Sequence, residues 1–190
     1  MVSTIVDSKR GVSFDEDSLL VERFLAGDNA SFEELYARYY ERVYALAYGI
    51  LLTHDETQDA VQEIFTLVYR NLYRFDRRSR FGTWLFRISV NRSIQEGRKR
   101  KYVKRTVPLT EALDKSSAPV EPESLDPRIE VALISLSPQD RAIIALFYWE
   151  ELSLNEIADF LGCNVNAAKT RLYRARERFR TAYDEGEDFL

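Results

Sequence analysis

The segment DAVQEIFTLVYRNL, residues 59–72, decides how the first half of the chain folds. Its apolar residues recur every three or four positions, which is the spacing of one face of an α-helix. The polar residues outside that spacing lie on a second surface of the helix; they are Asp59, Gln62 and Glu63. They either contact a partner or are only exposed to solvent. The apolar positions are Ala60, Val61, Ile64, Phe65, Val68 and Leu72.

Two further helices are predicted upstream of this segment. A short amphipathic helix over residues 17–26 ends at Gly27. A longer one runs from Ser31 to Leu51, because apolar residues again recur at a spacing near 3.6 residues. We expect the longer helix to pack against the core along its whole length.

A short polar segment, DRRSR at 76–80, follows and lies between Phe75 and Phe81. It has no periodicity, so we predict a loop bracketed by aromatic residues. After it, an aromatic-rich helix containing Trp84 and Phe86 leads into a basic one. Aromatic residues at helical spacing often fill a core, and this alternative stays open for Trp84 and Phe86. We expect the two phenylalanines beside the loop to be less buried.

Positive charge is concentrated in this part of the chain. Residues 70–105 contain 13 Lys and Arg against two acids, whereas the whole chain has 27 basic and 31 acidic residues. Clustered cations release counterions when they bind phosphates, so nucleic acid is the natural partner. The neighbouring aromatics indicate unpaired bases, whose ring faces are accessible. Asn91, where the helix becomes basic, would either hydrogen-bond an extruded base or face solvent.

The composition narrows the class of protein. With 45% hydrophobic residues, seven Gly and five Pro among 190 residues, the chain is predicted to be all-α. The single cysteine, Cys163, excludes an internal disulfide and a multi-cysteine metal site, and the single histidine, His54, excludes a histidine cluster. No catalytic residue, metal or cofactor is therefore predicted. Residues 1–16 are polar and no run approaches the roughly 18 apolar residues of a membrane span, so we expect a cytoplasmic protein with a flexible leader and no membrane insertion.

Residues 106–126 differ from the segments on either side. They contain three prolines, three serines and five acids against one lysine, without periodicity, which is typical of a linker. Fully extended, such a segment spans up to about 70 Å, enough to hold two domains well apart. We predict two helical domains joined by a flexible acidic linker. The parts are a leader at 1–16, a first domain at 17–105, the linker, a second domain at 127–183 and an acidic tail at 184–190.

The second domain has the pattern of a helix-turn-helix. Ser153 and Glu156 form a capping box at the start of one short helix, and Gly162 ends it. Asn164 then caps a basic final helix. Side chains near the start of such a helix reach base edges, and those further along reach phosphates. A basic face that is only solvated is the alternative. The outward face carries Asn166, Lys169, Thr170, Tyr173 and Arg174.

In this order, the features resemble the two-domain sigma factors of bacterial RNA polymerase, of the extracytoplasmic-function group (group 4). The residues that carry the resemblance are DAVQEIF at 59–65, FGTWLFRI at 81–88 with Asn91, and residues 152–179. The linker resembles the linker of these proteins only in its general composition. The resemblance implies a transcription initiation factor that binds core RNA polymerase, directs it to specific promoters and promotes strand opening. Many proteins of this family are held inactive by an anti-sigma factor, which is therefore a possible partner.

The resemblance also implies roles for individual residues. The second domain would bind duplex promoter DNA, while the first docks on the clamp helices of the polymerase's largest subunit and traps a flipped base. Lys169 stands where some relatives have arginine, and Gly82 stands where some have a bulkier residue. The promoter sequence that those relatives recognise can therefore not be assigned to this protein. The polymerase-binding set is Asp59, Gln62, Glu63 and Phe65; the minus-ten set is Phe75, Arg77, Arg78, Arg80, Phe81, Trp84 and Asn91; the minus-thirty-five set is Asn166, Lys169, Thr170, Tyr173 and Arg174.

A stand-alone helix-turn-helix regulator is the alternative, with the first half serving dimerisation or sensing. It accounts for residues 152–179 equally well, but it leaves the loop at 76–80 and the helix at 59–65 unexplained. A nuclease would need converging carboxylates or a metal site, and the sequence provides neither.

Overall fold

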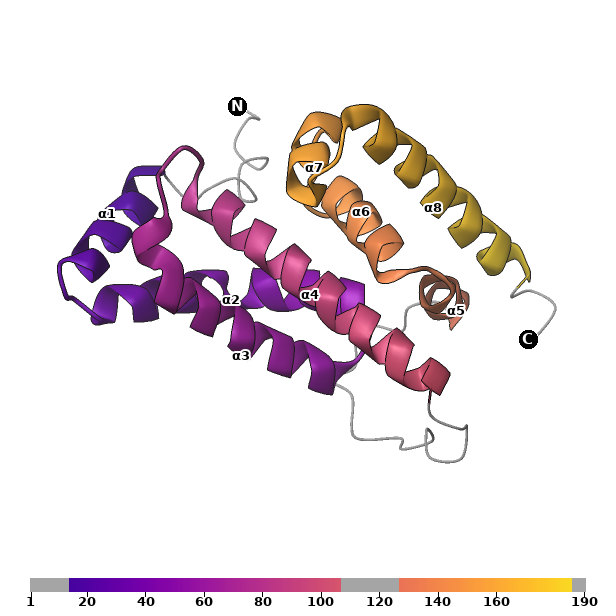
Figure 1. Ribbon diagram of the computed structural model, residues 1–190, viewed down its shortest axis with the longest axis horizontal. Coiled ribbons are helices and arrows are strands. Elements are labelled where there is room, and N and C mark those ends of the chain that lie inside the picture. Colours follow the sequence, from indigo (N-terminus) through magenta and orange to yellow (C-terminus); the bar gives the residue numbers. More distant parts are fainter. Residues whose placement is uncertain (1–13, 107–126, 186–190) are drawn as a thin grey trace, which may run out of the picture.

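The computed structural model of the protein describes residues 14–106 and 127–185. Within those ranges the regular structure is helical throughout, which confirms the predicted all-α fold. The helices form two groups that follow one another along the chain and lie side by side (Figure 1). The elements are α1 (Phe14–Leu25), α2 (Ala30–Leu51), α3 (His54–Asn71), the 3-10 turn η1 (Leu72–Arg74), α4 (Phe81–Thr106), α5 (Pro127–Ser135), α6 (Pro138–Tyr148), α7 (Leu154–Leu161) and α8 (Val165–Glu185).

Helix α2 is the centre of the first group, and α1, α3 and α4 all pack against it. The apolar spacing of α2 places Leu35, Val43 and Ile50 in the core, where they are fully buried. Helix α3 and the first residue of η1 contribute the predicted apolar face, and all six of those side chains are buried. Burying one side chain of this size contributes about 1.5–3 kcal/mol, so packing around α2 is the main source of stability in this domain.

The helices extend slightly beyond the predicted domain boundaries. Helix α1 begins at Phe14, three residues before the boundary at residue 17, and α8 continues to Glu185, two residues into the predicted tail. Helix α4 includes Thr106, the first residue assigned to the linker. The rest of the leader, the linker and the tail lies outside the described residues.

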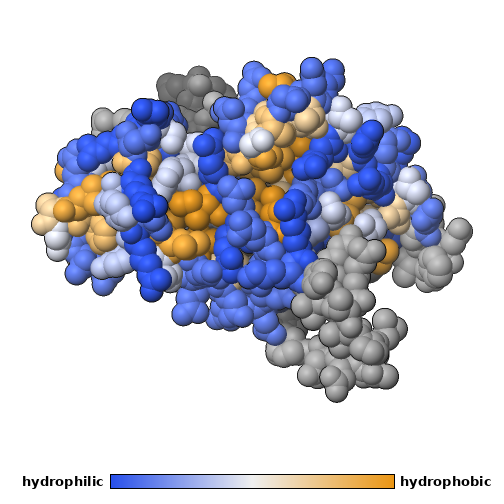
Figure 2. All heavy atoms as spheres, viewed as in Figure 1, coloured by the Kyte–Doolittle hydropathy of each residue, from blue (hydrophilic) through white to orange (hydrophobic). Residues whose placement is uncertain are grey.

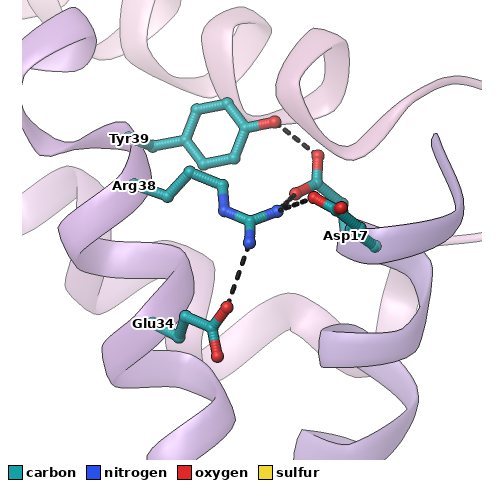
Figure 3. A network of polar contacts seen from close by, with 5 residues as sticks. Asp17, Glu34, Arg38 and Tyr39 are labelled. Carbon is teal, nitrogen blue, oxygen red and sulfur yellow. Dashed lines mark hydrogen bonds and ion pairs between the residues drawn. The ribbon is translucent and has the colours of Figure 1, made fainter. Parts of the chain in front are cut away.

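A buried carboxylate joins α1 to α2 (Figure 3). Asp17 is 4% exposed, accepts a hydrogen bond of 2.5 Å from the Tyr39 hydroxyl and forms an ion pair of 2.9 Å with Arg38. Arg38 is held in turn by Glu34, at 3.0 Å. Burial and the neighbouring Asp17 raise the pKa of Tyr39, so its hydroxyl keeps the proton that it donates.

The second group of helices has the predicted helix-turn-helix, formed by α7 and α8. The Ser153 and Glu156 capping box is present at the start of α7, and Gly162 ends that helix with a φ of 62°. The Asn164 side chain accepts a hydrogen bond of 2.8 Å from the backbone N–H of Ala167 in the first turn of α8. Helices α5, α6 and α7 all pack against α8. Local capping therefore determines the bend between the two helices.

The two groups are in direct contact, although the length of the linker would allow them to be well apart. Helix α6 packs against α2 and α4, and α7 packs against α4. Figure 1 shows α6 and α7, in orange, beside the magenta α4. Buried apolar residues of both groups form one continuous hydrophobic cluster.

Replacing Asp17 by asparagine is expected to lower the free energy of unfolding by about 1–3 kcal/mol, because the Arg38 and Tyr39 donors lose a charged acceptor in the core. Urea unfolding of the full chain, followed by circular dichroism, measures the change. Glu16→Gln is the matched control, because Glu16 is exposed and lies 3.4 Å from the same guanidinium. An equal loss in both variants would show that burial of Asp17 is not the cause.

Candidate polymerase and nucleic-acid interface

A groove between α2 and α3 contains two of the four predicted polymerase-binding residues. Gln62 and Phe65 line it, while Asp59 and Glu63 are exposed on the same helix. Phe65 is buried and packs against Tyr36, with 4.5 Å between the ring centroids. The groove has a volume of about 670 Å³ and is lined by Phe32, Tyr36, Tyr40, Gln58, Val61, Gln62, Phe65, Thr66, Tyr69 and Arg70.

Apart from Phe65, the aromatic side chains of this groove were not predicted as site residues. Tyr36 of α2 is 40% exposed and Tyr69 of α3 is 46% exposed. Buried residues of α2 nevertheless run from Ser31 to Leu51, so this helix packs on the core along its whole length, as expected. Five aromatic residues recur at four-residue steps in α2, and this regular spacing is the signal in the sequence. A step of four exceeds one helical turn only slightly, so these rings form a stripe that winds slowly around the helix. The stripe consists of Phe32, Tyr36, Tyr40, Tyr44 and Tyr48.

The two phenylalanines beside the predicted loop lie in the core. Phe75 is 6% exposed and Phe81 3%, which corrects the expectation that they are less buried than Trp84. Trp84 is only partly buried, and its ring packs on Phe75 at 5.4 Å. The two phenylalanines are buried because the ring of Tyr39 in α2 packs edge-on against Phe81 and keeps the ends of the loop in the core. The centroids of these two rings are 5.3 Å apart.

The loop between these phenylalanines exposes its arginines. Arg77, Arg78 and Arg80 all lie at the surface. Arg77 adopts a left-handed backbone conformation, with a φ of 59°, and forms an ion pair of 2.6 Å with Glu22 of α1. Arg78 is paired with Asp76 at 3.3 Å. Exposed ion pairs of this kind are weak, so the arginines can exchange their partners for phosphates at little cost.

Asn91 is exposed on α4 and follows Trp84 by seven residues, which is close to two helical turns. The two side chains therefore project from the same side of the helix. Arg92 beside Asn91 is bonded to Glu63 of α3 and, at 3.0 Å, to Glu96. The acidic surface of α3 thus meets the basic surface of α4 along one edge.

The outward face of α8 is as predicted. Asn166, Lys169, Thr170, Tyr173 and Arg174 are all exposed, with Tyr173 at 64%. The opposite face is buried through Ala168, Leu172 and Ala175.

A polar depression of about 620 Å³ lies beside this face, between α8 and the start of α6. Its lining also includes Ser137, Gln139, Arg171 and Arg178, for which no site role was predicted. Arg178 forms an ion pair of 2.6 Å with the buried Asp140 of α6, which fixes the orientation of α8.

We looked for a metal site and for a membrane-spanning helix in the part of the chain that the structure describes. No group of three or more His, Cys, Asp or Glu side chains there is arranged to hold a metal ion. Among the same residues, no helix combines the length and the apolar character needed to cross a membrane. The exposed groups present arginine, lysine, amide and aromatic side chains, which bind nucleic acid and protein.

Comparison with known proteins identifies the two helical groups. The family described as sigma-70 region 2 matches residues 35–102, and sigma-70, region 4 matches residues 127–179. The chain is 34% identical over 173 residues to the ECF RNA polymerase sigma factor SigW of Bacillus subtilis, covering 84% of this chain and 92% of that protein. It is also 34% identical over 176 residues to the ECF RNA polymerase sigma-E factor of Escherichia coli K12, covering 85% and 91%.

Solved structures agree with this comparison. CnrH, in complex with the cytosolic domain of CnrY, is similar with a TM-score of 0.65 and 25% identity over 90% of this chain and 99% of that one. RpoE from Bartonella quintana, in complex with the anti-sigma factor NepR, has a TM-score of 0.64 and 25% identity over 80% and 96%. A region 2 followed by a region 4 defines a sigma factor, which is an initiation factor and not an enzyme. The chain belongs to the extracytoplasmic-function sigma factors, and it directs RNA polymerase to promoters.

Replacing Arg174 by alanine is expected to reduce the slope of log binding constant against log salt by about one, because one phosphate contact is lost. Fluorescence anisotropy of the full chain with a labelled duplex of random sequence measures the slope. Arg180→Ala is the control, because Arg180 lies near the other end of α8 and is paired with Glu177 at 2.9 Å. Equal reductions in both variants would indicate a basic helix without a defined DNA face.

Proposed function

We propose that this sigma factor opens promoters by capture: the first domain traps unstacked bases of the minus-ten element while the second holds the minus-thirty-five element as a duplex. The observation that carries the proposal is the presence of three separate accessible surfaces. These are the groove between α2 and α3, the arginine loop with Trp84 and Asn91, and the outward face of α8. They suit a protein partner, unpaired bases and duplex DNA, respectively.

The groove would bind the clamp helices of the polymerase's largest subunit. Protein interfaces combine aromatic anchors at the centre with a polar rim. The half-exposed Tyr36 fits the role of an anchor, and Asp59, Gln62 and Glu63 fit the rim. Phe65 supports Tyr36 from the core side instead of forming the main contact.

Trp84 and Asn91 would receive the flipped base. The indole ring offers a face for stacking, and the Asn91 amide offers both a donor and an acceptor for a base edge. Unstacking costs a few kcal/mol per base, and stacking on an aromatic ring returns about 1–3 kcal/mol. Strand opening therefore draws on binding and needs no hydrolysis.

The remaining residues of the minus-ten set would act around this base. Arg77, Arg78 and Arg80 are exposed on the loop and would contact the strand's phosphates. The buried rings of Phe75 and Phe81 would hold the loop ends in place, a supporting role in place of direct contact with a base.

The outward face of α8 would enter the major groove of the minus-thirty-five element. Asn166, Lys169 and Thr170 lie in its first two turns, where side chains reach base edges. Tyr173 and Arg174 lie further along and would contact the backbone. Because an ammonium group is a single point charge, Lys169 cannot grip a guanine with the two-pronged geometry of arginine.

Further partners and the place of action follow from this function. Polymerase and promoters meet on the nucleoid, so we infer that the protein acts there, in the cytoplasm. RpoE was solved with the anti-sigma factor NepR, which supports the expectation that this chain also has an anti-sigma partner.

Run-off transcription by purified core polymerase on a genomic fragment library tests the function itself. Discrete start sites are expected only when this protein is present, whereas a stand-alone regulator would produce none.

The double substitution Asp59→Ala and Gln62→Ala is expected to weaken binding to core polymerase by at least about fivefold, since two polar contacts at the rim are lost and each contributes about 0.5–1.5 kcal/mol. Fluorescence anisotropy with labelled protein and core polymerase measures the affinity. Binding to random duplex DNA through α8 should not change. The matched control is Gln95→Ala with Glu130→Ala, which removes exposed side chains of the same kinds from α4 and α5. Similar losses of affinity for core polymerase in both double variants would contradict the assignment of α3 to the polymerase-binding surface.

Trp84→Ala is expected to reduce transcription from a closed duplex promoter strongly, and to reduce it much less from a template whose minus-ten region is mismatched and already open. Stacking on Trp84 offsets the cost of unstacking, and an open template removes that cost. Run-off transcription on the two templates gives the ratio. Gln95→Ala, exposed on the same helix, should leave both rates unchanged. A Trp84→Ala defect of equal size on both templates would contradict base capture.

A further inference from the structure

Tyr73 is an exposed aromatic residue that the function proposed above does not use. It lies in η1, at the end of α3, and it is 65% exposed. Within the described ranges no other large hydrophobic residue is more exposed, and Tyr73 lines neither the groove between α2 and α3 nor the depression beside α8. A single exposed ring is ordinary on a protein surface, so exposure alone assigns no role. The groups around the ring indicate what it binds.

The neighbouring arginine holds the ring of Tyr73 in place. The Nε of Arg74 donates a hydrogen bond of 2.9 Å to the Tyr73 hydroxyl, and its guanidinium carbon lies 5.3 Å from the centre of the ring. A cation at this distance is attracted to the face of an aromatic ring. The ring therefore has little freedom to lose when a second flat group stacks on its exposed surface.

The cation beside this ring is not neutralised. In the described part of the chain no carboxylate forms an ion pair with Arg74, whereas Arg77 and Arg78 in the loop are both paired. Residues 70–80 contain five arginines and one acid. Figure 2 shows hydrophilic residues where the loop between α3 and α4 lies beside α1 in the view of Figure 1. A free guanidinium next to an exposed ring offers one contact for a phosphate and one for the face of a base.

Tyr73 also lies close to the ring that is proposed to receive the flipped base. The N–H of Phe75 donates a hydrogen bond of 3.0 Å to the carbonyl of Leu72, which closes the turn, and two residues of chain span at most about 7 Å. The ring of Phe75 packs in turn on Trp84, with 5.4 Å between the centroids. A nucleic-acid strand advances by at least about 3.4 Å per nucleotide. A few nucleotides of one strand therefore reach from Trp84 to Tyr73.

The position of Tyr73 suits an unpaired base and not a duplex. In duplex DNA each base is covered by its neighbours, and proteins read the edges of the bases with a helix or a pair of strands in a groove. Tyr73 lies on a turn of three residues, which has neither shape. An unpaired base, in contrast, stacks on an aromatic ring whatever its identity.

We propose that Tyr73 and Arg74 form a second nucleotide-binding site of the first domain, in which an unpaired base of the promoter strand stacks on the Tyr73 ring while its phosphate contacts Arg74. This site lies a few nucleotides from the base held by Trp84 and Asn91. The identity of the strand rests on the proposed function, whereas the binding of single-stranded DNA does not. Because stacking tolerates any base, the site adds affinity for the open strand without adding a sequence preference.

Fluorescence of 2-aminopurine in the promoter strand tests the site in the complex with core polymerase. This base analogue loses fluorescence when it stacks. It is placed at one position of the minus-ten region at a time, in a promoter found by run-off transcription and kept open by mismatches. Two positions are expected to be quenched in wild type. Trp84→Ala should restore the fluorescence at one of them and Tyr73→Ala at the other, because each ring holds a different base.

Two variants serve as controls in this experiment. Tyr73→Phe keeps the ring and should keep the quenching. Tyr148→Ala removes a tyrosine that is 54% exposed and that has the guanidinium of Arg176 over its ring at 5.2 Å, so it resembles Tyr73 in its surroundings, and it should change no position. A Tyr73→Ala variant that leaves both positions quenched, or that restores fluorescence at the Trp84 position as well, would overturn a separate site.

Binding of single-stranded DNA by the free chain tests the site without polymerase or a promoter. Fluorescence anisotropy with a short labelled oligodeoxythymidine is measured in an excess of unlabelled random duplex, which occupies α8. Tyr73→Ala should weaken binding by at least about fivefold, which corresponds to about 1 kcal/mol of stacking on one base. Tyr73→Phe should bind within about twofold of wild type, because stacking does not require the hydroxyl. Tyr148→Ala should bind as wild type does.

The salt dependence of the same binding separates the ring from the cation. Arg74→Gln should lower the slope of log binding constant against log salt by about 0.7, the value for one phosphate of a single strand. Tyr73→Ala should leave the slope unchanged. An affinity that does not fall in Tyr73→Ala, or that falls equally in Tyr148→Ala, would contradict the proposal. If no promoter position is quenched in wild type but Tyr73→Ala weakens binding to the oligonucleotide, the proposed base capture fails and the Tyr73 site stands.

Discussion

The packing of apolar side chains around α2 is the interaction on which the rest of the molecule depends. Helices α1, α3 and α4 pack on it from the first domain and α6 from the second, and its residues Val43, Ala47 and Ile50 are completely buried. The same helix contributes aromatic rings to the groove near its start and a glycine to the domain interface near its end. One helix therefore connects the surface proposed to bind the polymerase to the surface that contacts the second domain.

The first domain separates its charges by helix. Carboxylates lie on α3 and cations on the loop and α4, and the pair of Glu63 and Arg92 marks the border between them. A polyanion is repelled from the acidic side and attracted to the basic one, so DNA does not compete for the face of α3. With the function proposed above, this separation would let a small domain bind a protein and a nucleic acid at the same time.

The sequence was sufficient where local chemistry decides the structure. Ser153, Glu156, Gly162 and Asn164 act on backbone groups a few residues away, so the helix-turn-helix was predictable. Features that depend on distant partners were not. Burial of Phe75 and Phe81 depends on Tyr39, burial of Asp17 depends on two side chains of the next helix, and the domain contact depends on matching surfaces that linker composition does not reveal. The roles of individual site residues came from the resemblance and stay predictions.

The continuous hydrophobic cluster has a thermodynamic consequence. The chain has the architecture of two units, yet its buried residues form a single body that includes Val43 on one side and Ile143 on the other. Unfolding of either unit exposes apolar surface on the other unit to water. Unfolding one unit therefore lowers the stability of the other. Heating the intact protein should consequently produce one cooperative heat-absorption peak in place of two.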